Sequence, residues 1–172
     1  MTTRPTSDRL RETLFNVLGQ RIEGSRFLDL YAGSGAVGIE AASRGAERVV
    51  LVERVQPALK VLRANLESLG LRNAVRVESL SVAVFLKKVR PESANLAFEI
   101  IFMDPPYEAE NEYALALGLL GGEASGLMAK DAVVIAEHRR KYKPADRYGL
   151  LERSRLLEQG DAALSFYRTV IH

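Results

Sequence analysis

Apolar residues along this chain form two patterns, short continuous runs and longer stretches with helical spacing. Continuous runs of about five residues are typical of buried parallel strands, and apolar positions three or four residues apart indicate amphipathic helices. Leu10, Leu14 and Leu18, for example, recur at helical spacing. On this basis the sequence predicts helices over residues 7–22, 36–44, 57–69, 81–89 and 111–120, and strands over residues 27–31, 48–53, 75–78, 100–103 and 132–136.

The C-terminal part of the chain has a different pattern. Residues 149–158 and 162–168 are extended candidates, joined by Gly160-Asp161, a dipeptide typical of hairpin turns. The preceding strands alternate with helices, which requires parallel strands and right-handed crossovers. The prediction is a single α/β domain over residues 1–172, a three-layer sandwich with a Rossmann-like, mostly parallel seven-stranded sheet and a C-terminal antiparallel hairpin.

Composition narrows the chemistry that this chain can perform. The absence of cysteine excludes disulfides, thiolate metal sites and cysteine nucleophiles, and two histidines argue against a histidine-based metal site. No apolar stretch reaches the length of a membrane span, and no signal peptide opens the chain. We therefore expect a cytoplasmic protein, a monomer, with no metal and no membrane contact.

Positive charge is concentrated in one segment, although the net charge is only +2. Residues 139–155 contain seven Lys or Arg against two acids, a local excess of five positive charges. Such a segment is either a solvated loop or a patch that faces phosphates. The candidate RNA-binding residues are Arg139, Arg140, Lys141 and Lys143.

A glycine-rich stretch, DLYAGSGAVGIEAASRGA (29–46), connects the first predicted strand to the next helix. Gly33 and Gly35 let the backbone approach a ligand, and the amides of the helix N-terminus point at it. Glu53 ends the second predicted strand, where a carboxylate can accept two ribose hydroxyls. The pattern fits a dinucleotide or a nucleoside. Asp29 would repel a pyrophosphate and attract an ammonium, so it favours S-adenosylmethionine over NAD.

The apolar run 100–103 is followed by Asp104-Pro105-Pro106-Tyr107. Two prolines fix the backbone in a stiff, extended form that cannot donate to a sheet. The segment is either a turn that ends a strand or a grip for a flat, amino-bearing ligand. In the second case the Asp104 carboxylate and the Pro105 carbonyl each accept an N–H of an exocyclic amine. Tyr107 can stack on the base, which must be unpaired or flipped out.

Together, the glycine-rich stretch and the DPPY tetrapeptide resemble the class I S-adenosylmethionine-dependent methyltransferases. More narrowly, they resemble the bacterial 16S ribosomal RNA (guanine-966-N2)-methyltransferase family. RPTSDRLRETLFNVL (4–18), EH (137–138) and GDAALSFYR (160–168) match it too, so the resemblance covers nearly the whole chain. It implies an N-terminal helical segment over residues 1–25, without the basic segment that usually precedes it in this family. It also implies that the substrate is 16S rRNA within an assembling small ribosomal subunit.

Two other functions stay open at this point, because DPPY alone is shared with many amino-methylating enzymes. One is an adenine-N6 methyltransferase of RNA or DNA, and the other is a nucleotide-binding module without catalysis. The candidate catalytic residues are Asp104, Pro105, Pro106 and Tyr107. The candidate cofactor-binding residues are Asp29, Tyr31, Gly33, Ser34, Gly35, Glu53, Arg54, Ser79, Leu80 and Asp104.

Overall fold

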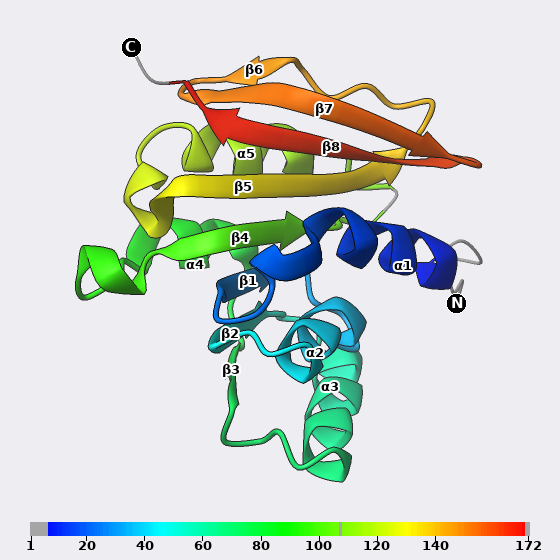
Figure 1. Cartoon of the computed structure of the whole chain (residues 1–172), viewed down its shortest axis with the longest axis vertical. Coiled ribbons are helices and arrows are strands. Elements are labelled where there is room, and N and C mark those ends of the chain that lie inside the picture. The colour runs from blue at the N-terminus through cyan, green and yellow to red at the C-terminus, as the bar shows by residue number, and fades with distance from the viewer. Residues whose placement is uncertain (1–6, 107, 171–172) are drawn as a thin grey trace.

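The strands of this protein form a single mixed sheet (Figure 1). The computed structural model describes residues 7–106 and 108–170. Within these ranges, eight strands pair in the order β3-β2-β1-β4-β5-β8-β7-β6. The first five strands in sequence are parallel, and the last three pair antiparallel. The strands are β1 (Arg26–Leu30), β2 (Arg48–Val52), β3 (Val75–Glu78), β4 (Phe98–Met103), β5 (Met128–Arg139), β6 (Arg147–Tyr148), β7 (Leu151–Gln159) and β8 (Ala162–Thr169).

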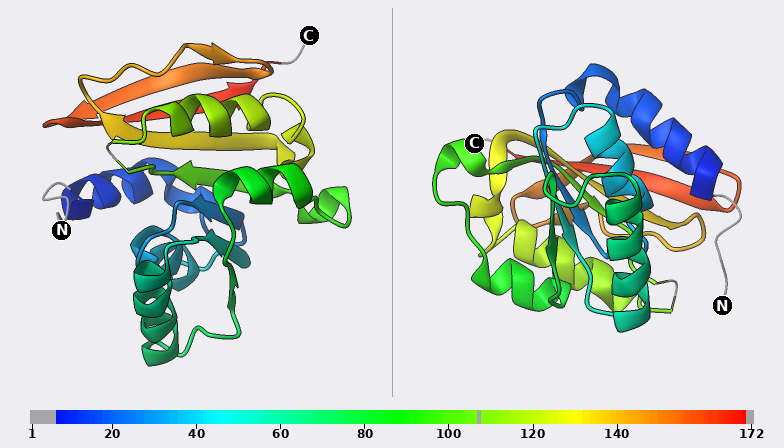
Figure 2. Two further views of the ribbon diagram at one scale, coloured as in Figure 1. Left: turned by 180° about the vertical axis from the view of Figure 1, so that it is seen from behind. Right: turned by 90° about the horizontal axis from the view of Figure 1, so that it is seen from below.

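Helices cover both faces of this sheet, which gives the fold three layers (Figure 2). α1, α2 and α3 pack on one face, and α4 and α5 pack on the other. Adjacent residues of β1, such as Phe27 and Leu28, belong to opposite cores because strand side chains alternate between faces. The helices are α1 (Ser7–Leu18), α2 (Ala36–Ser43), α3 (Gln56–Ser68), α4 (Val82–Lys88) and α5 (Asn111–Leu120), with short 3-10 turns η1 (Gly19–Arg21), η2 (Ala94–Leu96) and η3 (Ser125–Leu127).

The predicted three-layer α/β architecture and its C-terminal hairpin are confirmed. The described sheet has one strand more than the seven predicted, because β6 is only two residues long and leaves no periodic signal. The predicted helix 7–22 is too long. α1 ends at Leu18, and Gly19 takes a positive φ of 52° as the chain continues into η1. β5 begins at Met128, four residues before its predicted start.

The parallel strands all present their carboxyl ends at one edge of the sheet, where open α/β folds bind ligands. Arg139, at the end of β5, pairs with Ala162 at the start of β8, so the β7–β8 turn lies at this edge too. The Thr13 hydroxyl of α1 donates to Gln159 Oε1 of β7 (2.7 Å), which holds α1 beside the same edge. Among the described helices, none is long and apolar enough to cross a bilayer.

Candidate active site

A cavity of about 640 Å³ opens at the carboxyl ends of the parallel strands. Its wall is drawn from α1, the loop after β1, the ends of β2, β4 and β5, and the segments that begin α4 and α5. Many of the residues predicted from the sequence meet here, although they come from distant parts of the chain. Those that line the cavity are Asp29, Tyr31, Gly33, Ser34, Glu53, Arg54, Leu80, Asp104 and Pro106.

Some predicted residues lie elsewhere. Gly35 and Ser79 do not line the cavity, and neither does Pro105, which is buried. Tyr107, predicted to stack on a base, falls outside the described residues. The predicted RNA-binding residues do not line the cavity and are exposed: Arg139 is the last residue of β5, and Arg140, Lys141 and Lys143 follow it.

The glycines of the loop after β1 have different structural roles. Gly33 has a φ of 60°, and a Cβ built on it would meet no heavy atom within 4 Å, so the backbone here is open to a ligand. Gly35 has a φ of 89° and caps α2, and a Cβ on it would collide with the Leu62 side chain. A Cβ on Gly38 would collide with Leu51 of β2. The last two glycines are therefore required by packing, and only Gly33 leaves room for a cofactor.

Glu53 fixes this loop with its side chain. Oε1 accepts the Gly33 N–H (2.7 Å), and Oε2 accepts the N–H groups of Arg54 (3.1 Å) and Val55 (3.0 Å). A carboxylate offers about four lone-pair positions. Three are occupied in this geometry, so Oε1 keeps one for a ligand. The predicted contact of Glu53 with ribose hydroxyls would use this remaining position.

Asp29 lies in the middle of the sheet with only 2% of its surface exposed, and it also lines the cavity. Its Oδ2 accepts the Gly38 N–H at 3.0 Å. Burial raises the pKa of Asp29 well above its usual range, and the nearby carboxylates of Asp104, Glu53 and Glu137 add to this rise. The Gly38 N–H opposes it only in part. Asp29 therefore holds its proton to higher pH than an exposed aspartate, and a cationic ligand would favour its ionised form.

The raised pKa of Asp29 predicts a pH-dependent effect of Asp29→Asn on the ligand-free protein. A carboxyl whose pKa is higher in the folded state contributes stability below its unfolded pKa, and this is lost as pH rises through the folded pKa. Asparagine has no proton to lose, so we expect a higher Tm than wild type at pH 8 and a shrinking difference as pH falls toward 4. Thermal unfolding followed at several pH values measures this, and a pH-independent difference would contradict it.

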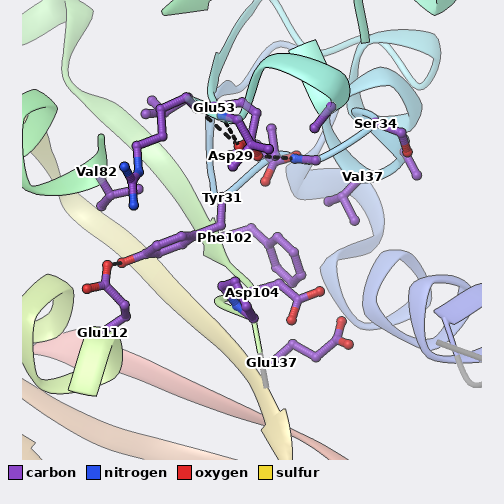
Figure 3. Close-up of a pocket in the computed structure, with 18 of the residues that line it drawn as sticks. Asp29, Tyr31, Ser34, Val37, Glu53, Val82, Phe102, Asp104, Glu112 and Glu137 are labelled. Atoms are coloured by element: carbon purple, nitrogen blue, oxygen red, sulfur yellow. Dashed lines mark hydrogen bonds between the residues drawn. The ribbon is translucent and has the colours of Figure 1, made fainter. Parts of the chain in front are cut away.

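Tyr31 spans the cavity from the end of β1 to α5 (Figure 3). Its hydroxyl donates to Glu112 Oε1 at 2.8 Å, and it is the one non-glycine residue of the described chain with a positive φ, 60°. Burial, together with the hydrogen bond to Glu112, raises the pKa of Tyr31 far above its usual value, so the hydroxyl stays protonated. The strained backbone and this bond fix the ring between the glycine loop and the segment that follows Asp104.

Asp104 and Glu137 form the side of the cavity opposite Glu53 (Figure 3). Met103 and Ala136 are register partners on β4 and β5, so the residues that follow them stand side by side (Figure 3). The buried Tyr113 hydroxyl donates to the Glu137 carbonyl (2.7 Å), which fixes the backbone of β5 at this point. Two carboxylates thus reach the cavity from neighbouring strands, and one of them, Asp104, stands immediately before the stiff proline segment.

Several cavity residues were not identified from the sequence. The matching stretch EH (137–138) includes Glu137, but nothing assigned it to the site. Arg11, on α1, lines the cavity and is held by Glu40 (3.1 Å). Glu112 and Phe102 also belong to the wall. A sequence signal exists only for Phe102 and Glu137, which lie at or beside the carboxyl ends of predicted strands.

His138, beside Glu137, does not belong to the cavity wall. It is buried, with Nε2 2.8 Å from Ser165 Oγ and Nδ1 2.8 Å from the Arg139 carbonyl oxygen. Burial lowers the pKa of His138, so the ring is neutral near pH 7. Its partners identify it as a hydrogen-bonded structural residue that joins β5 to β8.

The basic segment after β5 carries less unpaired charge than its sequence suggests. Arg140 lies 3.4 Å from Glu158, Arg147 lies 4.0 Å from Glu152, and Arg153 pairs with Asp146. Lys141 and Lys143 are exposed at the start of the segment. The patch that can meet phosphates is therefore concentrated at residues 139–143, at the same sheet edge as the cavity.

Comparison with known proteins places this geometry in a family. The family model described as "Conserved hypothetical protein 95" matches residues 1–168. The chain belongs to this family. It is 34% identical to the "Putative rRNA methyltransferase YlbH" of Bacillus subtilis, over 96% of this chain and 88% of the relative. It is 37% identical to the "Ribosomal RNA small subunit methyltransferase D" of Escherichia coli, over 78% of this chain.

The second of these matches spans only 63% of the Escherichia coli relative. A solved structure, the "Putative methyltransferase yhhF from Escherichia coli", superposes with a TM-score of 0.80 at 31% identity, over 98% of this chain and 89% of that one. The sequence-based expectation of a Rossmann-like fold and membership of an rRNA methyltransferase family is confirmed.

Proposed function

We propose that this protein transfers a methyl group from S-adenosylmethionine to the exocyclic N2 amine of a guanine in 16S ribosomal RNA. One observation carries the proposal. The glycine loop with Glu53, and Asp104 with Pro106, line a single cavity, so a nucleoside cofactor and an amine-bearing base can meet there. The relatives' names support RNA as the substrate class.

The residues of the cavity suit the chemical groups of this cofactor. Gly33 leaves open backbone, Glu53 offers one lone pair to a ribose hydroxyl, and Asp29 provides a carboxyl for the ammonium. Arg11 and Arg54 are the cations of the described wall, and either can meet the cofactor carboxylate. The bound cofactor supplies an electrophilic methyl group on a sulfonium, so the protein's own task is to orient the acceptor.

Asp104 would orient the acceptor base, on the side of the cavity that it forms with Glu137. The lone pair of an exocyclic amine is delocalised into its ring, which makes the nitrogen a weak nucleophile. Asp104 accepts one N–H of the amine. The proposed acceptor of the other is the carbonyl of Pro105, which is held in place by the prolines and adjoins Asp104, although Pro105 is not itself part of the cavity lining. The nitrogen lone pair is then directed at the methyl group, a gain from preorganised geometry. A base inside a duplex could not reach this site and must be unpaired or flipped out.

The basic patch at residues 139–143 would hold the RNA backbone beside the cavity. We expect the double change Lys141→Glu and Lys143→Glu to weaken RNA binding and to flatten its dependence on salt. Each lost contact to single-stranded RNA should reduce the slope of log affinity against log salt by about 0.7. These two lysines are chosen because Arg140 is already paired with Glu158, so reversing its charge would also break that ion pair. Binding titrations at several salt concentrations measure both effects.

A matched control is the double change Lys87→Glu and Lys88→Glu at the exposed end of α4. It alters net charge by the same amount at a distance from the patch. If both double variants lose RNA affinity equally, only net charge affects RNA binding, and the hypothesis that residues 139–143 form an RNA-binding patch is wrong. Cofactor affinity should be unchanged in both.

The activity itself is tested with purified protein, methyl-labelled S-adenosylmethionine and two substrates, deproteinised 16S rRNA and small ribosomal subunits from cells that lack the protein. After digestion to nucleosides, the label should appear in N2-methylguanosine. Label in N6-methyladenosine would replace the proposal with the adenine alternative. The absence of transfer to both substrates would reject the proposal.

A further inference from the structure

The basic patch at residues 139–143 contains one aromatic residue, Tyr142, which stands between Lys141 and Lys143. Both lysines are exposed, and the tyrosine is half-buried. The Tyr142 N–H donates to the Arg139 carbonyl at 3.1 Å, so the backbone here forms a hydrogen-bonded turn. An aromatic ring and two cations are therefore held together on one short turn.

Two aromatic rings pack against Tyr142 from the same side. The Tyr113 centroid lies 5.0 Å from that of Tyr142, at an interplanar angle of 32°, and the His138 centroid lies 6.3 Å away, at 80°. Tyr113 and His138 are themselves 6.3 Å apart, so the directions from Tyr142 to these two neighbours form an acute angle. Both neighbours are buried, whereas Tyr142 keeps exposed surface. The ring is supported on its inner side and has surface left for a ligand on its outer side.

Tyr142 also lies close to the side of the cavity that Asp104 and Glu137 form. Its hydroxyl is 3.5 Å from the Glu110 carbonyl oxygen, which is a long hydrogen bond. Ala109, the residue before Glu110, lines the cavity together with Asp104. An RNA strand that places its target base beside Asp104 would therefore bring the next nucleotide close to Tyr142.

The chemistry of this turn suits single-stranded RNA. Proteins hold such strands with cations that contact the phosphates and with aromatic rings on which the bases stack, and stacking accepts any base. Burial, with Tyr148 and Glu110 nearby, raises the pKa of Tyr142, so the ring is uncharged near pH 7. It can thus stack on a base without repelling the adjacent phosphate.

We propose that Tyr142 is a stacking platform for the base next to the target nucleotide, with Lys141 and Lys143 on the flanking phosphates. This inference rests on the proposed function, because it takes a single RNA strand as the ligand. Tyr142 binds RNA and takes no part in methyl transfer. A neighbouring base that stacks on Tyr142 no longer stacks on the target base, which favours the extruded state that the cavity requires.

Binding of a single-stranded oligouridine of about 12 nucleotides, within the usual range of site sizes, tests the platform. Tyr142→Phe keeps the ring and should bind this RNA as the wild-type protein does. Tyr142→Leu keeps apolar volume without an aromatic face, and its affinity should fall by about 5- to 150-fold, as for the loss of one stacked base. Fluorescence anisotropy measures these affinities without any methyl transfer.

Tyr148→Leu is the matched control, because Tyr148 is another half-buried tyrosine of the chain after β5, with its ring packed against Tyr167. It should bind oligouridine as wild type does. Calorimetric titration with S-adenosylmethionine checks that each variant is folded. Wild-type affinity in Tyr142→Leu would overturn the inference, and so would an equal loss in Tyr148→Leu or a wild-type protein that does not bind oligouridine.

A second measurement uses the unaltered protein and does not depend on the folding of a variant. Oligouridine that carries 5-iodouridine cross-links under ultraviolet light to aromatic side chains in contact with it. We expect an adduct on Tyr142, located by mass spectrometry of the digested protein. Adducts on other residues alone, or no adduct, would overturn the inference.

The stacking platform and the proposed reaction fail separately in these experiments. If the wild-type protein methylates no guanine but Tyr142→Leu loses RNA affinity, the proposed reaction is wrong and the RNA contact stands. If it methylates guanine and Tyr142→Leu binds RNA as wild type does, only the role of Tyr142 is wrong.

Discussion

Replacing Asp104 with alanine is expected to lower the rate of methyl transfer at least about 100-fold, the usual cost of one preorganised hydrogen-bonding group. Cofactor affinity should stay nearly intact, because the glycine loop and Glu53 follow other strands, β1 and β2. The carboxylate matters for the position of the amine, and its loss leaves the nitrogen free to rotate away from the methyl group. Single-turnover rates at saturating cofactor measure transfer, and calorimetry measures affinity.

Asp104→Asn sharpens this prediction, because it keeps one acceptor oxygen and removes the charge. Its rate should fall between those of wild type and Asp104→Ala. Glu108→Ala, an exposed change four residues further on, should leave the rate unchanged. Near-normal turnover in Asp104→Ala would remove this residue from the mechanism, whatever the other variants do.

Glu53→Ala should weaken S-adenosylmethionine binding by about 10- to 100-fold. The loss of a hydrogen bond to a charged group costs about 1.5–3 kcal/mol, and 1.4 kcal/mol corresponds to a factor of ten in affinity. Two effects combine in this variant. The ribose loses its acceptor, and the amides of Gly33, Arg54 and Val55 lose the carboxylate that fixes them. Calorimetric titration gives the affinity directly.

The control for this variant is Glu47→Ala, an exposed acid just before the opposite end of β2. It should bind the cofactor as wild type does. Glu53→Gln separates the two effects, because a single amide oxygen cannot accept from all three backbone groups. Unchanged affinity in Glu53→Ala, or a preference of the wild-type protein for NAD, would contradict the assignment of Glu53 and the glycine loop to S-adenosylmethionine binding.

The sequence predicts well those features that depend on local pattern. Continuous apolar runs such as residues 100–103 become buried strands, and Gly160-Asp161 forms the hairpin turn, because each pattern specifies its own backbone. The glycine loop and Asp104 could be placed on one edge for a related reason. Parallel strands joined by right-handed crossovers bring their carboxyl ends together wherever the intervening helices lie.

Residues whose position depends on packing between distant elements could not be found this way. Arg11 reaches the cavity because α1 crosses beside the β7–β8 turn, and Glu112 does so because Tyr31 meets it from β1. Neither contact can be predicted from the local sequence pattern. The three backbone amides that donate to Glu53 could not be predicted either, since they depend on how the chain turns after β2.

The most direct test of the central claim is made on ribosomal RNA from living cells. 16S rRNA is purified from a strain that lacks this protein and from its parent, digested, and analysed by mass spectrometry for methylated nucleosides. We expect one N2-methylguanosine to disappear in the deletion strain and to return with the wild-type gene, but not with Asp104→Ala. An unchanged N2-methylguanosine content, or the loss of N6-methyladenosine in its place, would contradict the claim.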